Sequence, residues 1–410
     1  MGGTGREEGE MRKANNRKWN SEESVRQRER VRSCGHCSRR WVSTGVRGAA
    51  GGALRQVQEP DPQASPTPSP PESQPSSTTT TTATASSTTH PFTLTEPDLH
   101  NMFEDIKKEL RSQFELHDIA EYYFDGQGKA VRPMVTLLMS RALNIHLHSD
   151  NRLTKAQREV AKVAEMIHTA SLVHDDVLDA SDKRRGKPSV NCLYGQRKAV
   201  MAGDYILSVA STMLARIRNE EVLVVLSQVL ADLVQGEFMQ LGSKENENER
   251  FAHYLKKTFK KTASLLAYSC KAVAILSGAD EDIQEVAFQY GRNIGIAFQL
   301  IDDRLDFVAT SSEIGKPTGA DLKMGMATAP VLFACEKFPE LNPMIMRRFQ
   351  EPGDVQRALE LVHQSDGLEQ TVFLARQHCQ EAIKVINSIK SSPEQKALIT
   401  LTDKIMTPVK

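Results

Sequence analysis

Aspartates spaced as metal ligands occur at two places in this chain. Each group has the spacing i, i+1 and i+4 and follows an apolar run, and together they comprise Asp175, Asp176, Asp179, Asp302, Asp303 and Asp306. On a helix, the first and last carboxylates of each group lie one turn apart on the same face, where they repel each other. A bound cation removes this repulsion, and clustered carboxylate oxygens suit Mg²⁺, which keeps several waters and bridges to phosphate.

One acidic group of this kind could be only the solvated end of a helix. Two copies, each entered from an apolar run, favour a binding site over that interpretation. We therefore expect two acidic helices that face each other, with metal ions and a diphosphate held between them.

Basic side chains recur close in sequence to both acidic groups. Lys129 and Arg132 stand before Pro133, where a helix would begin, and Arg184 and Arg185 follow the first group after a short polar loop. Lysine and arginine near a helix N-terminus suit phosphate, and adjacent arginines suit two different phosphate groups. Solvated surface side chains are the plainer interpretation of each pair taken alone.

Two further cationic positions accompany the acidic groups. Lys261 precedes Thr262 within a predicted helix, and Lys316 follows the second acidic group. A site that neutralises a diphosphate needs such positive groups in addition to Mg²⁺, and both kinds of group recur here.

Small side chains lie beneath the first acidic group. Ser171 and His168 stand four and seven residues before Asp175 and share its helix face, and Ala170 is next to them. Small residues leave space for a growing apolar chain, which a large aromatic residue would close. His168 is either an ordinary core histidine or a group that reaches a phosphate from this face.

From residue 92 onward, apolar residues repeat with a helical period. We expect helices over 99–116, 131–143, 200–217, 221–241, 253–276, 283–307, 355–364 and 369–389, and another whose apolar stripe at 160–167 leads into the first acidic group. No alternating strand pattern competes. The predicted fold class is all-α, a single large bundle of long helices around a central cavity that spans residues 92–410.

Residues 1–91 differ in composition from the rest. Prolines recur over 60–75, and 76–89 are almost entirely Ser, Thr and Ala, so we predict a disordered N-terminal region. Residues 30–58 contain arginines and no acidic residue, which is typical of a mitochondrial transit segment. Glutamates earlier in the chain fit that pattern less well, and a basic disordered tail is the alternative.

The bulk composition excludes several classes of protein. Lys and Arg number 52 and Asp and Glu also 52 in 410 residues, so no net charge favours binding to nucleic acid. Six scattered cysteines suit a reducing compartment better than a disulfide scaffold. No run of 18 apolar residues occurs, so no transmembrane helix is expected.

Taken in order, these motifs resemble those of the trans-type polyprenyl diphosphate synthases. The motifs are GKAVRP (128–133), DDVLD (175–179), RRG (184–186), GE (236–237), KT (261–262), QLIDDRLD (299–306) and GK (315–316). Within that family, the stretches GSKENENERF (242–251) and APVLFAC (329–335) are similar to the subunit 1 group of decaprenyl and solanesyl diphosphate synthases. The resemblance implies the isoprenoid synthase fold.

The resemblance also implies a role for each motif residue. The six aspartates would hold two to three Mg²⁺ ions on an allylic diphosphate, which Arg184 would also bind. Isopentenyl diphosphate would be bound by Lys129, Arg132, His168 and Arg185. The leaving diphosphate and the developing cation would be contacted by Lys261, Thr262, Gln299 and Lys316.

The function that follows is condensation of an allylic diphosphate, farnesyl or geranylgeranyl, with successive isopentenyl diphosphates. Because Ala170 and Ser171 are small, we expect a long product rather than a C15 or C20 one. The resemblance implies a length of about C45–C50, the size of a ubiquinone side chain. The resemblance implies a mitochondrial location, in the matrix or at the inner membrane, with peripheral membrane association. It also implies a second synthase subunit, in a heterotetramer.

Two alternatives stay open at the level of the sequence. One is a shorter-chain synthase of the geranylgeranyl type. The other is a non-catalytic regulatory subunit of a hetero-oligomeric synthase, although such a subunit would be expected to lose acidic ligands that this chain keeps. A terpene cyclase shares acidic motifs but has no evident use for Lys129 and Arg132.

Overall fold

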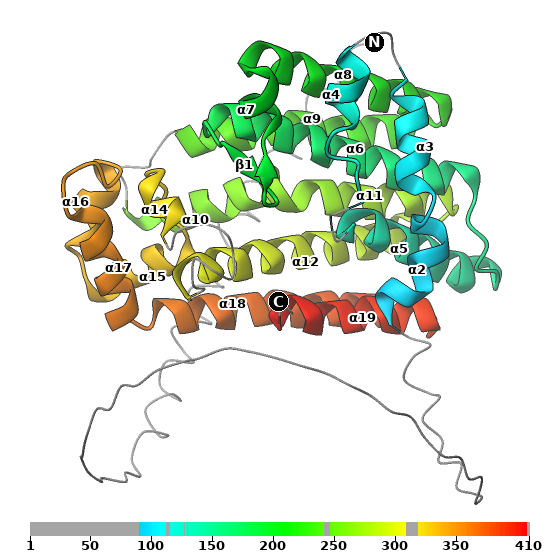
Figure 1. Cartoon of the computed structure of the whole chain (residues 1–410). Helices are drawn as coiled ribbons and strands as arrows, with labels where there is room; N and C mark the ends of the chain where they lie inside the picture. Colours follow the sequence, from blue (N-terminus) through cyan, green and yellow to red (C-terminus); the bar gives the residue numbers. More distant parts are fainter. Residues whose placement is uncertain are drawn as a thin grey trace, which may run out of the picture.

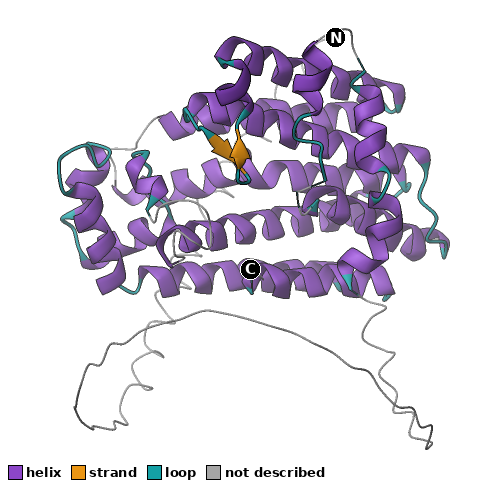
Figure 2. Ribbon diagram, in the orientation of Figure 1, coloured by secondary structure: helices purple, strands orange, loops and turns teal. Residues whose placement is uncertain are grey.

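The computed structural model describes residues 90–111, 115–126, 128, 130–241, 247–308 and 319–407. These residues form long helices that run roughly side by side across the molecule (Figure 1). Figure 2 shows that almost all of the described chain is helical, apart from loops and one short hairpin. The predicted all-α fold class is therefore confirmed.

The N-terminal part of the bundle includes the first acidic group, at the end of α6. Its helices are α2 (Pro91–Leu99), α3 (Met102–Glu109), α4 (Glu115–Glu121), α5 (Val131–His148), α6 (Lys155–Leu178) and α7 (Val190–Tyr194). Between α6 and α7, β1 (Lys183–Arg184) and β2 (Lys187–Pro188) form an antiparallel hairpin.

The middle of the chain supplies the longest helices. They are α8 (Gln196–Arg216), α9 (Glu220–Leu241), α10 (Glu247–Thr258), the π-helix η3 (Phe259–Ala263), α11 (Ser264–Leu276) and α12 (Glu281–Val308). The C-terminal helices are α14 (Ala320–Lys323), α15 (Ala329–Lys337), α16 (Leu341–Met346), α17 (Asp354–Gln364), α18 (Gly367–Ile386) and α19 (Pro393–Met406). Helix α12 packs between α11 and α18, and α6 packs against α8.

Helix α6 begins and ends at signals in its own sequence. Thr154 Oγ1 accepts a hydrogen bond from the Gln157 N–H at 3.2 Å, and the Thr154 N–H donates to Gln157 Oε1 at 2.9 Å. This reciprocal cap fixes the first turn. Ala180, with φ of 48°, stops the helix just after Asp179, so the first acidic group occupies its last turn.

Close contact between α12 and the π-helix depends on one glycine. A Cβ atom at Gly295 would lie 2.6 Å from Ala263 Cα, closer than any side chain permits. The missing side chain lets the backbones of α12 and η3 approach each other. As a result, the Lys261–Thr262 pair lies alongside the helix that carries the second acidic group.

Two helix predictions need correction. The continuous helix expected over residues 99–116 is divided between the end of α2, all of α3 and the start of α4. Met102 and Ile106 pack into the main core, whereas Leu116 packs against a smaller cluster around Val190. The helix expected over residues 253–276 is interrupted by the π-turn of η3. The short hairpin at residues 183–188 was not expected either, and it is too brief to produce an alternating pattern.

The predictions for residues 1–91 fall almost entirely outside the described residues, so the disordered region and the transit segment stay predictions. Membrane spanning was not expected. By length and hydropathy alone, one described helix could cross a membrane, since Glu220–Gln240 of α9 has a mean hydropathy of 1.5. In the structure, however, Asp232 of this helix accepts a hydrogen bond from Lys260 of η3, so one side of α9 is packed within the bundle.

Candidate active site

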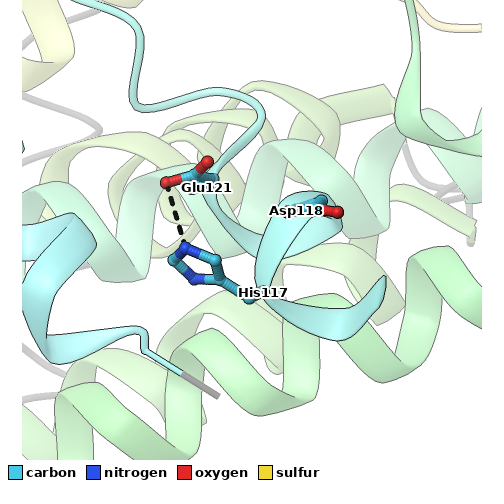
Figure 3. A group of neighbouring side chains, drawn as sticks. All are labelled: His117, Asp118 and Glu121. Carbon is cyan, nitrogen blue, oxygen red and sulfur yellow. Dashed lines mark ion pairs between the residues drawn. The ribbon is translucent and has the colours of Figure 1, made fainter. Parts of the chain in front are cut away.

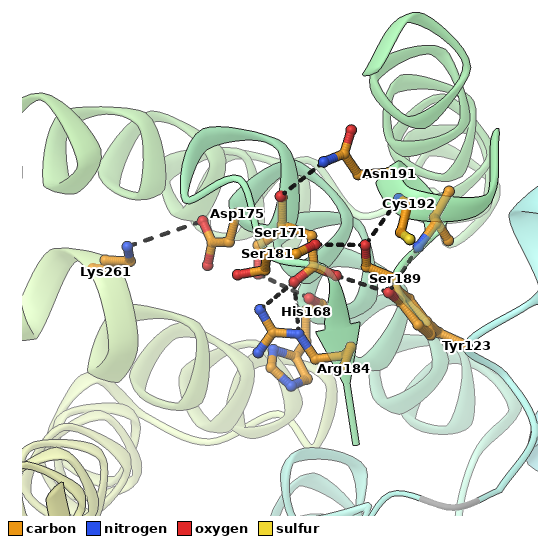
Figure 4. Close-up of polar contacts among 12 residues, drawn as sticks. Tyr123, His168, Ser171, Asp175, Ser181, Arg184, Ser189, Asn191, Cys192 and Lys261 are labelled. Carbon is orange, nitrogen blue, oxygen red and sulfur yellow. Dashed lines mark hydrogen bonds and ion pairs between the residues drawn. The ribbon is translucent and has the colours of Figure 1, made fainter. Parts of the chain in front are cut away.

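The two acidic groups approach a common structural element, the π-helix η3. Lys261 Nζ lies 3.9 Å from Asp175 Oδ1 of the first group, reaching across from the neighbouring helix in Figure 4. The next residue, Thr262, donates from Oγ1 to Gln299 Oε1 at 2.9 Å, and Gln299 Nε2 donates to Asp303 Oδ1 of the second group at 2.8 Å. Two adjacent residues thus connect groups more than a hundred positions apart.

The π-turn is what presents Lys261 in this way. One extra residue per turn re-aims the side chains of a helix, and such turns are frequent at functional sites. Helix α9 fits against the turn through Gly236, where a Cβ would lie 2.9 Å from the Lys261 backbone nitrogen. The adjacent Glu237 forms an ion pair with Lys261, whose ammonium also donates to Gln240 Oε1 at 3.3 Å.

The first acidic group divides into outward and inward carboxylates. Asp175 is partly exposed and Asp179 exposed, whereas Asp176 is completely buried. Asp176 Oδ2 accepts a hydrogen bond from Tyr123 Oη at 2.7 Å, and Oδ1 accepts one from Arg184 Nε at 2.9 Å. In Figure 4 the labelled side chains of Tyr123 and Arg184 extend toward each other from two different parts of the chain.

The second acidic group has the same division. Asp302 is exposed, Asp306 is partly exposed and Asp303 is buried. Asp303 Oδ2 accepts a hydrogen bond from Tyr254 Oη at 2.6 Å, in addition to the bond that Oδ1 accepts from Gln299. Both groups therefore combine one buried aspartate with two that are more exposed.

Helix position and burial make both groups electrostatically unfavourable without a counter-charge. Each lies at the C-terminal end of its helix, where the macrodipole already carries partial negative charge. Burial, with the charges of Glu237 and Asp179, raises the pKa of Asp175 to about 6 against the opposing charge of Lys261. Carboxylates so placed are suited to holding a hard cation.

A fourth carboxylate adjoins the second group. Burial and the charges of Asp303, Asp306 and Asp302 together raise the pKa of Asp321 to about 7. The backbone N–H groups of Ala320 and Asp321 donate to the Asp306 carboxylate at 3.0 and 3.2 Å. This contact places α14 directly against the second acidic group.

A cationic cluster lies deeper on the α6 side of the site. Burial lowers the pKa of Arg132. Burial also holds the pKa of His168 well below its ordinary value, and the charges of the neighbouring Arg132, Arg185 and Arg184 lower it further. His168 is therefore neutral at physiological pH. Arg132 Nε is buried and has no hydrogen-bond partner among the residues the structure describes. Such an atom is costly unless a ligand accepts its hydrogen bond.

Several predicted residues are placed by these contacts, and two are not. Arg132, His168 and Arg185 come together as expected, and so do Lys261, Thr262 and Gln299. Arg184 is next to them but is engaged by Asp176. Lys129 and Lys316 lie outside the described residues, so their roles stay predictions.

The predicted chain-length residues occupy the helix that carries the first group. Ala170 is completely buried and belongs to the main core, while Ser171 is partly exposed and donates from Oγ to the His168 carbonyl at 2.8 Å. Their placement below Asp175 agrees with the helix geometry expected from the sequence. Their effect on product length stays a prediction.

Sequence reasoning missed five residues that the structure brings to the site. They are Tyr123, Glu165, Tyr254, Lys257 and Asp321. Glu165 is buried beside the cationic cluster, where Arg132 and Arg185 oppose the rise in its pKa caused by burial. Its position ten residues before Asp175 on the same predicted helix could have indicated that Glu165 lies near the site. No sequence spacing relates Tyr123 or Tyr254 to the acidic groups.

Another set of potential metal ligands lies elsewhere, on α4. His117, Asp118 and Glu121 place one ligand atom each within 4.8 Å of one another (Figure 3). His117 Nε2 lies 3.6 Å from Glu121 Oε2, and its Nδ1 lies 3.3 Å from the Leu110 carbonyl oxygen. This set lies on α4, whereas the two acidic groups lie on α6 and α12.

Comparison with known proteins agrees with this geometry. Residues 113–362 match the polyprenyl synthetase family. The human protein named all trans-polyprenyl-diphosphate synthase PDSS1 is 60% identical over 320 residues, which are 78% of this chain and 77% of the human protein. Solanesyl-diphosphate synthase 1, mitochondrial, of Oryza sativa subsp. japonica is 41% identical over 339 residues, covering 78% of this chain and 79% of the rice protein.

A solved structure shares the fold. The polyprenyl synthase of Caulobacter crescentus, in complex with calcium and isoprenyl diphosphate, superposes with a TM-score of 0.71 at 30% identity, over 78% of this chain and 98% of that one. The expected isoprenoid synthase fold and the resemblance drawn from the motifs are both confirmed. This chain therefore belongs to the polyprenyl synthetase family, whose members named above are polyprenyl-diphosphate synthases.

Proposed function

We propose that this chain lengthens an allylic diphosphate with successive isopentenyl diphosphates and so makes a long-chain all-trans polyprenyl diphosphate, the precursor of a ubiquinone side chain. One observation carries the proposal. Neighbouring residues of η3 contact the first acidic group directly and the second through Gln299, so the two groups can act on one bound diphosphate.

The carboxylates fit Mg²⁺ by their donor chemistry. The exposed and partly exposed members offer oxygen ligands at two helix ends whose charge calls for a cation; they are Asp175, Asp179, Asp302 and Asp306. Asp176 and Asp303 would support them from the buried side. When bound, Mg²⁺ supplies positive charge to the diphosphate that leaves the allylic carbon. The number of ions, two to three, is part of the proposal.

The protein's own cations complete the charge balance. Breaking the allylic C–O bond leaves diphosphate with growing negative charge, which Lys261 is placed to stabilise because it lies beside Asp175. Arg132 and Arg185, with neutral His168, would hold the diphosphate of isopentenyl diphosphate, and the unpaired Nε of Arg132 is suited to donate to it. Lys129 and Lys316 would add to these two sites.

The second substrate's double bond then attacks the allylic cation, and a proton is lost. The cation must be kept from water, so the residues beneath the acidic group have to be apolar or small. Ala170 and Ser171 meet that requirement and would let a chain of about C45–C50 pass between the helices. Farnesyl or geranylgeranyl diphosphate is the proposed primer.

Exposed apolar residues on helix α9 support the proposal of a partner subunit. Its outward face exposes Leu223, Val234 and Phe238, which are spaced at i, i+11 and i+15 and so form one stripe. Phe238 is 72% exposed, an unfavourable position for a phenyl ring in water. We propose that a second synthase subunit covers this stripe in a heterotetramer, with peripheral contact to the inner mitochondrial membrane on the matrix side. The rice relative is itself named as mitochondrial.

The test is incubation of the full chain, with and without a candidate partner subunit, with allylic diphosphate, labelled isopentenyl diphosphate and Mg²⁺. Chromatography of the dephosphorylated products gives their lengths directly. We expect products near C45–C50. A C20 end product would favour a shorter-chain synthase, and unextended primer in every condition would favour a regulatory subunit without activity.

A further inference from the structure

The two acidic groups share a feature that their sequence motif does not contain. In each, the second aspartate is buried and accepts a hydrogen bond from a tyrosine of another element. Tyr123, just past α4, donates to Asp176 at 2.7 Å, and Tyr254 of α10 donates to Asp303 at 2.6 Å. Both tyrosines are themselves buried. The same contact has therefore been built twice, from unrelated parts of the chain.

Helix geometry shows what this contact controls. Successive residues are rotated by about 100° around a helix axis, so the residue before the anchored aspartate and the residue three after it point to the same side, roughly 40° apart. Those residues are Asp175 and Asp179 in α6, and Asp302 and Asp306 in α12. Holding the middle carboxylate inside the bundle thus sets the rotation of the helix end and directs the other two outward.

A tyrosine is suited to this role for a second reason. Its hydroxyl donates a hydrogen bond without adding positive charge, so the acidic group keeps the charge it needs for a cation. Burial and the neighbouring carboxylate raise the pKa of both tyrosines, so their hydroxyls stay protonated and remain donors. The phenol is also stiff, having few rotatable bonds, and so holds the carboxylate at a fixed distance.

The two contacts differ in what supports them. Asp176 also accepts a hydrogen bond from Arg184 Nε at 2.9 Å. Tyr123 Oη in turn accepts one from the Val190 N–H at 3.1 Å, which ties the start of α7 to the first group. Asp303 has Gln299 at 2.8 Å and the distant Ala329 N–H at 3.4 Å. Tyr254 is therefore the harder of the two tyrosines to replace.

We propose that Tyr254 and Tyr123 are positioning residues that anchor the buried aspartate of each acidic group and thereby aim the remaining carboxylates at the metal–diphosphate site. This inference rests on the proposed function. If the proposal is right, removing one tyrosine hydroxyl weakens Mg²⁺ binding although the tyrosine does not itself contact the metal.

The test is calorimetric titration of the full chain with Mg²⁺ in the presence of inorganic diphosphate. Tyr254→Phe is expected to weaken Mg²⁺ binding by about tenfold, within the range for residues that orient metal ligands, and Tyr123→Phe by less. Tyr290→Phe is the matched control, since Tyr290 is equally buried and donates to the Leu398 carbonyl at 2.9 Å, away from the acidic groups. Its Mg²⁺ binding should equal that of the wild type.

Two further measurements distinguish a positioning role of Tyr254 from a purely structural one. Raising Mg²⁺ should restore much of the turnover of Tyr254→Phe, while the KM for isopentenyl diphosphate stays unchanged. The effects of Tyr254→Phe and Asp303→Asn should be non-additive, because the two residues act as one unit. Equal Mg²⁺ affinity in Tyr254→Phe, Tyr290→Phe and the wild type would overturn the inference and leave the proposed function intact. Failure of the wild type to bind Mg²⁺ with diphosphate would overturn both.

Discussion

Lys261 Nζ lies 3.9 Å from Asp175 Oδ1 although 86 positions separate the two residues in the chain. The contact depends on the π-turn of η3 and on Gly236, which lets α9 approach that turn. The neighbouring lysine shows how specific the arrangement is. Lys260 points the other way, and its ammonium lies 2.6 Å from Asp232 Oδ1 of α9. One lysine faces the acidic groups, and the other holds the bundle together.

This difference predicts opposite effects for the same substitution at adjacent positions. Lys261→Gln should lower kcat by about 100-fold, the typical loss when one group that stabilises developing charge is removed. Lys260→Gln breaks a largely buried ion pair and should destabilise the fold by about 3 kcal/mol while leaving turnover per folded molecule within a factor of three. Steady-state kinetics and urea unfolding of both variants check this. Equal losses of turnover would contradict the assignment.

Product length should respond to the size of residue 170. Ala170→Phe places a large ring beneath Asp175 and is expected to shorten the main product, because the growing chain meets it. Overpacking will also cost about 1–3 kcal/mol of stability, since Ala170 is completely buried. Chromatography of the products measures length independently of how much enzyme is folded.

The control for this variant is Ala382→Phe, which overpacks an equally buried alanine on α18. It should lower stability and leave product length unchanged. Unchanged length in Ala170→Phe, or equal shortening in both variants, would count against a chain path along this face of α6.

Assembly should respond to the exposed stripe on α9. Phe238→Glu places a charge where we propose that a partner subunit packs, and should reduce the mass of the complex formed with that subunit in sedimentation experiments. Met346→Glu, at a 39% exposed residue on α16, is the control and should leave the mass unchanged. If Phe238→Glu assembled normally but lost binding to lipid vesicles, the stripe would be a membrane contact instead.

The free energy of unfolding should depend on pH partly through one buried histidine, His378. Burial lowers the pKa of His378 to about 3, and its Nδ1 lies 2.7 Å from Asn293 Oδ1. Because the folded pKa lies below the unfolded value of about 6.5, the unfolded chain takes up a proton first, and stability falls as pH falls below 6.5. From pH 7.5 to 5, this one group should cost about 2 kcal/mol.

His378→Gln removes that group and should unfold with a shallower dependence on pH. Urea unfolding of both proteins over this range measures the difference. Parallel curves would show that His378 does not titrate on unfolding as its burial requires.

Much of the site was predictable because its chemistry follows helical spacing. The i, i+1, i+4 aspartates and the residues below Asp175 are read from a period of 3.6, and the structure places them on the expected helices. Local periodicity also predicted most of the helices. It failed at residues 99–116, where packing into two different clusters determines where the helices end.

The contacts between distant segments could not be predicted. Nothing near Tyr254 in the sequence indicates that its hydroxyl reaches Asp303, and the π-turn at Lys261 has no local signature. The division of each acidic group into one buried and two more exposed carboxylates is likewise a result of packing. Sequence spacing placed all three aspartates of each group together, but only the fold shows which of them faces inward.

The central claim is that both acidic groups hold one diphosphate through Mg²⁺. Calorimetric titration with Mg²⁺ and inorganic diphosphate, applied to Asp175→Asn, Asp302→Asn and the double variant, tests it most directly. Sites that share a ligand are non-additive. We predict that each single variant loses most of the binding and that the double variant is little worse. If each single variant kept one full-affinity Mg²⁺ site and the two losses of binding were additive in the double variant, the acidic groups would be independent sites. That result would contradict the account.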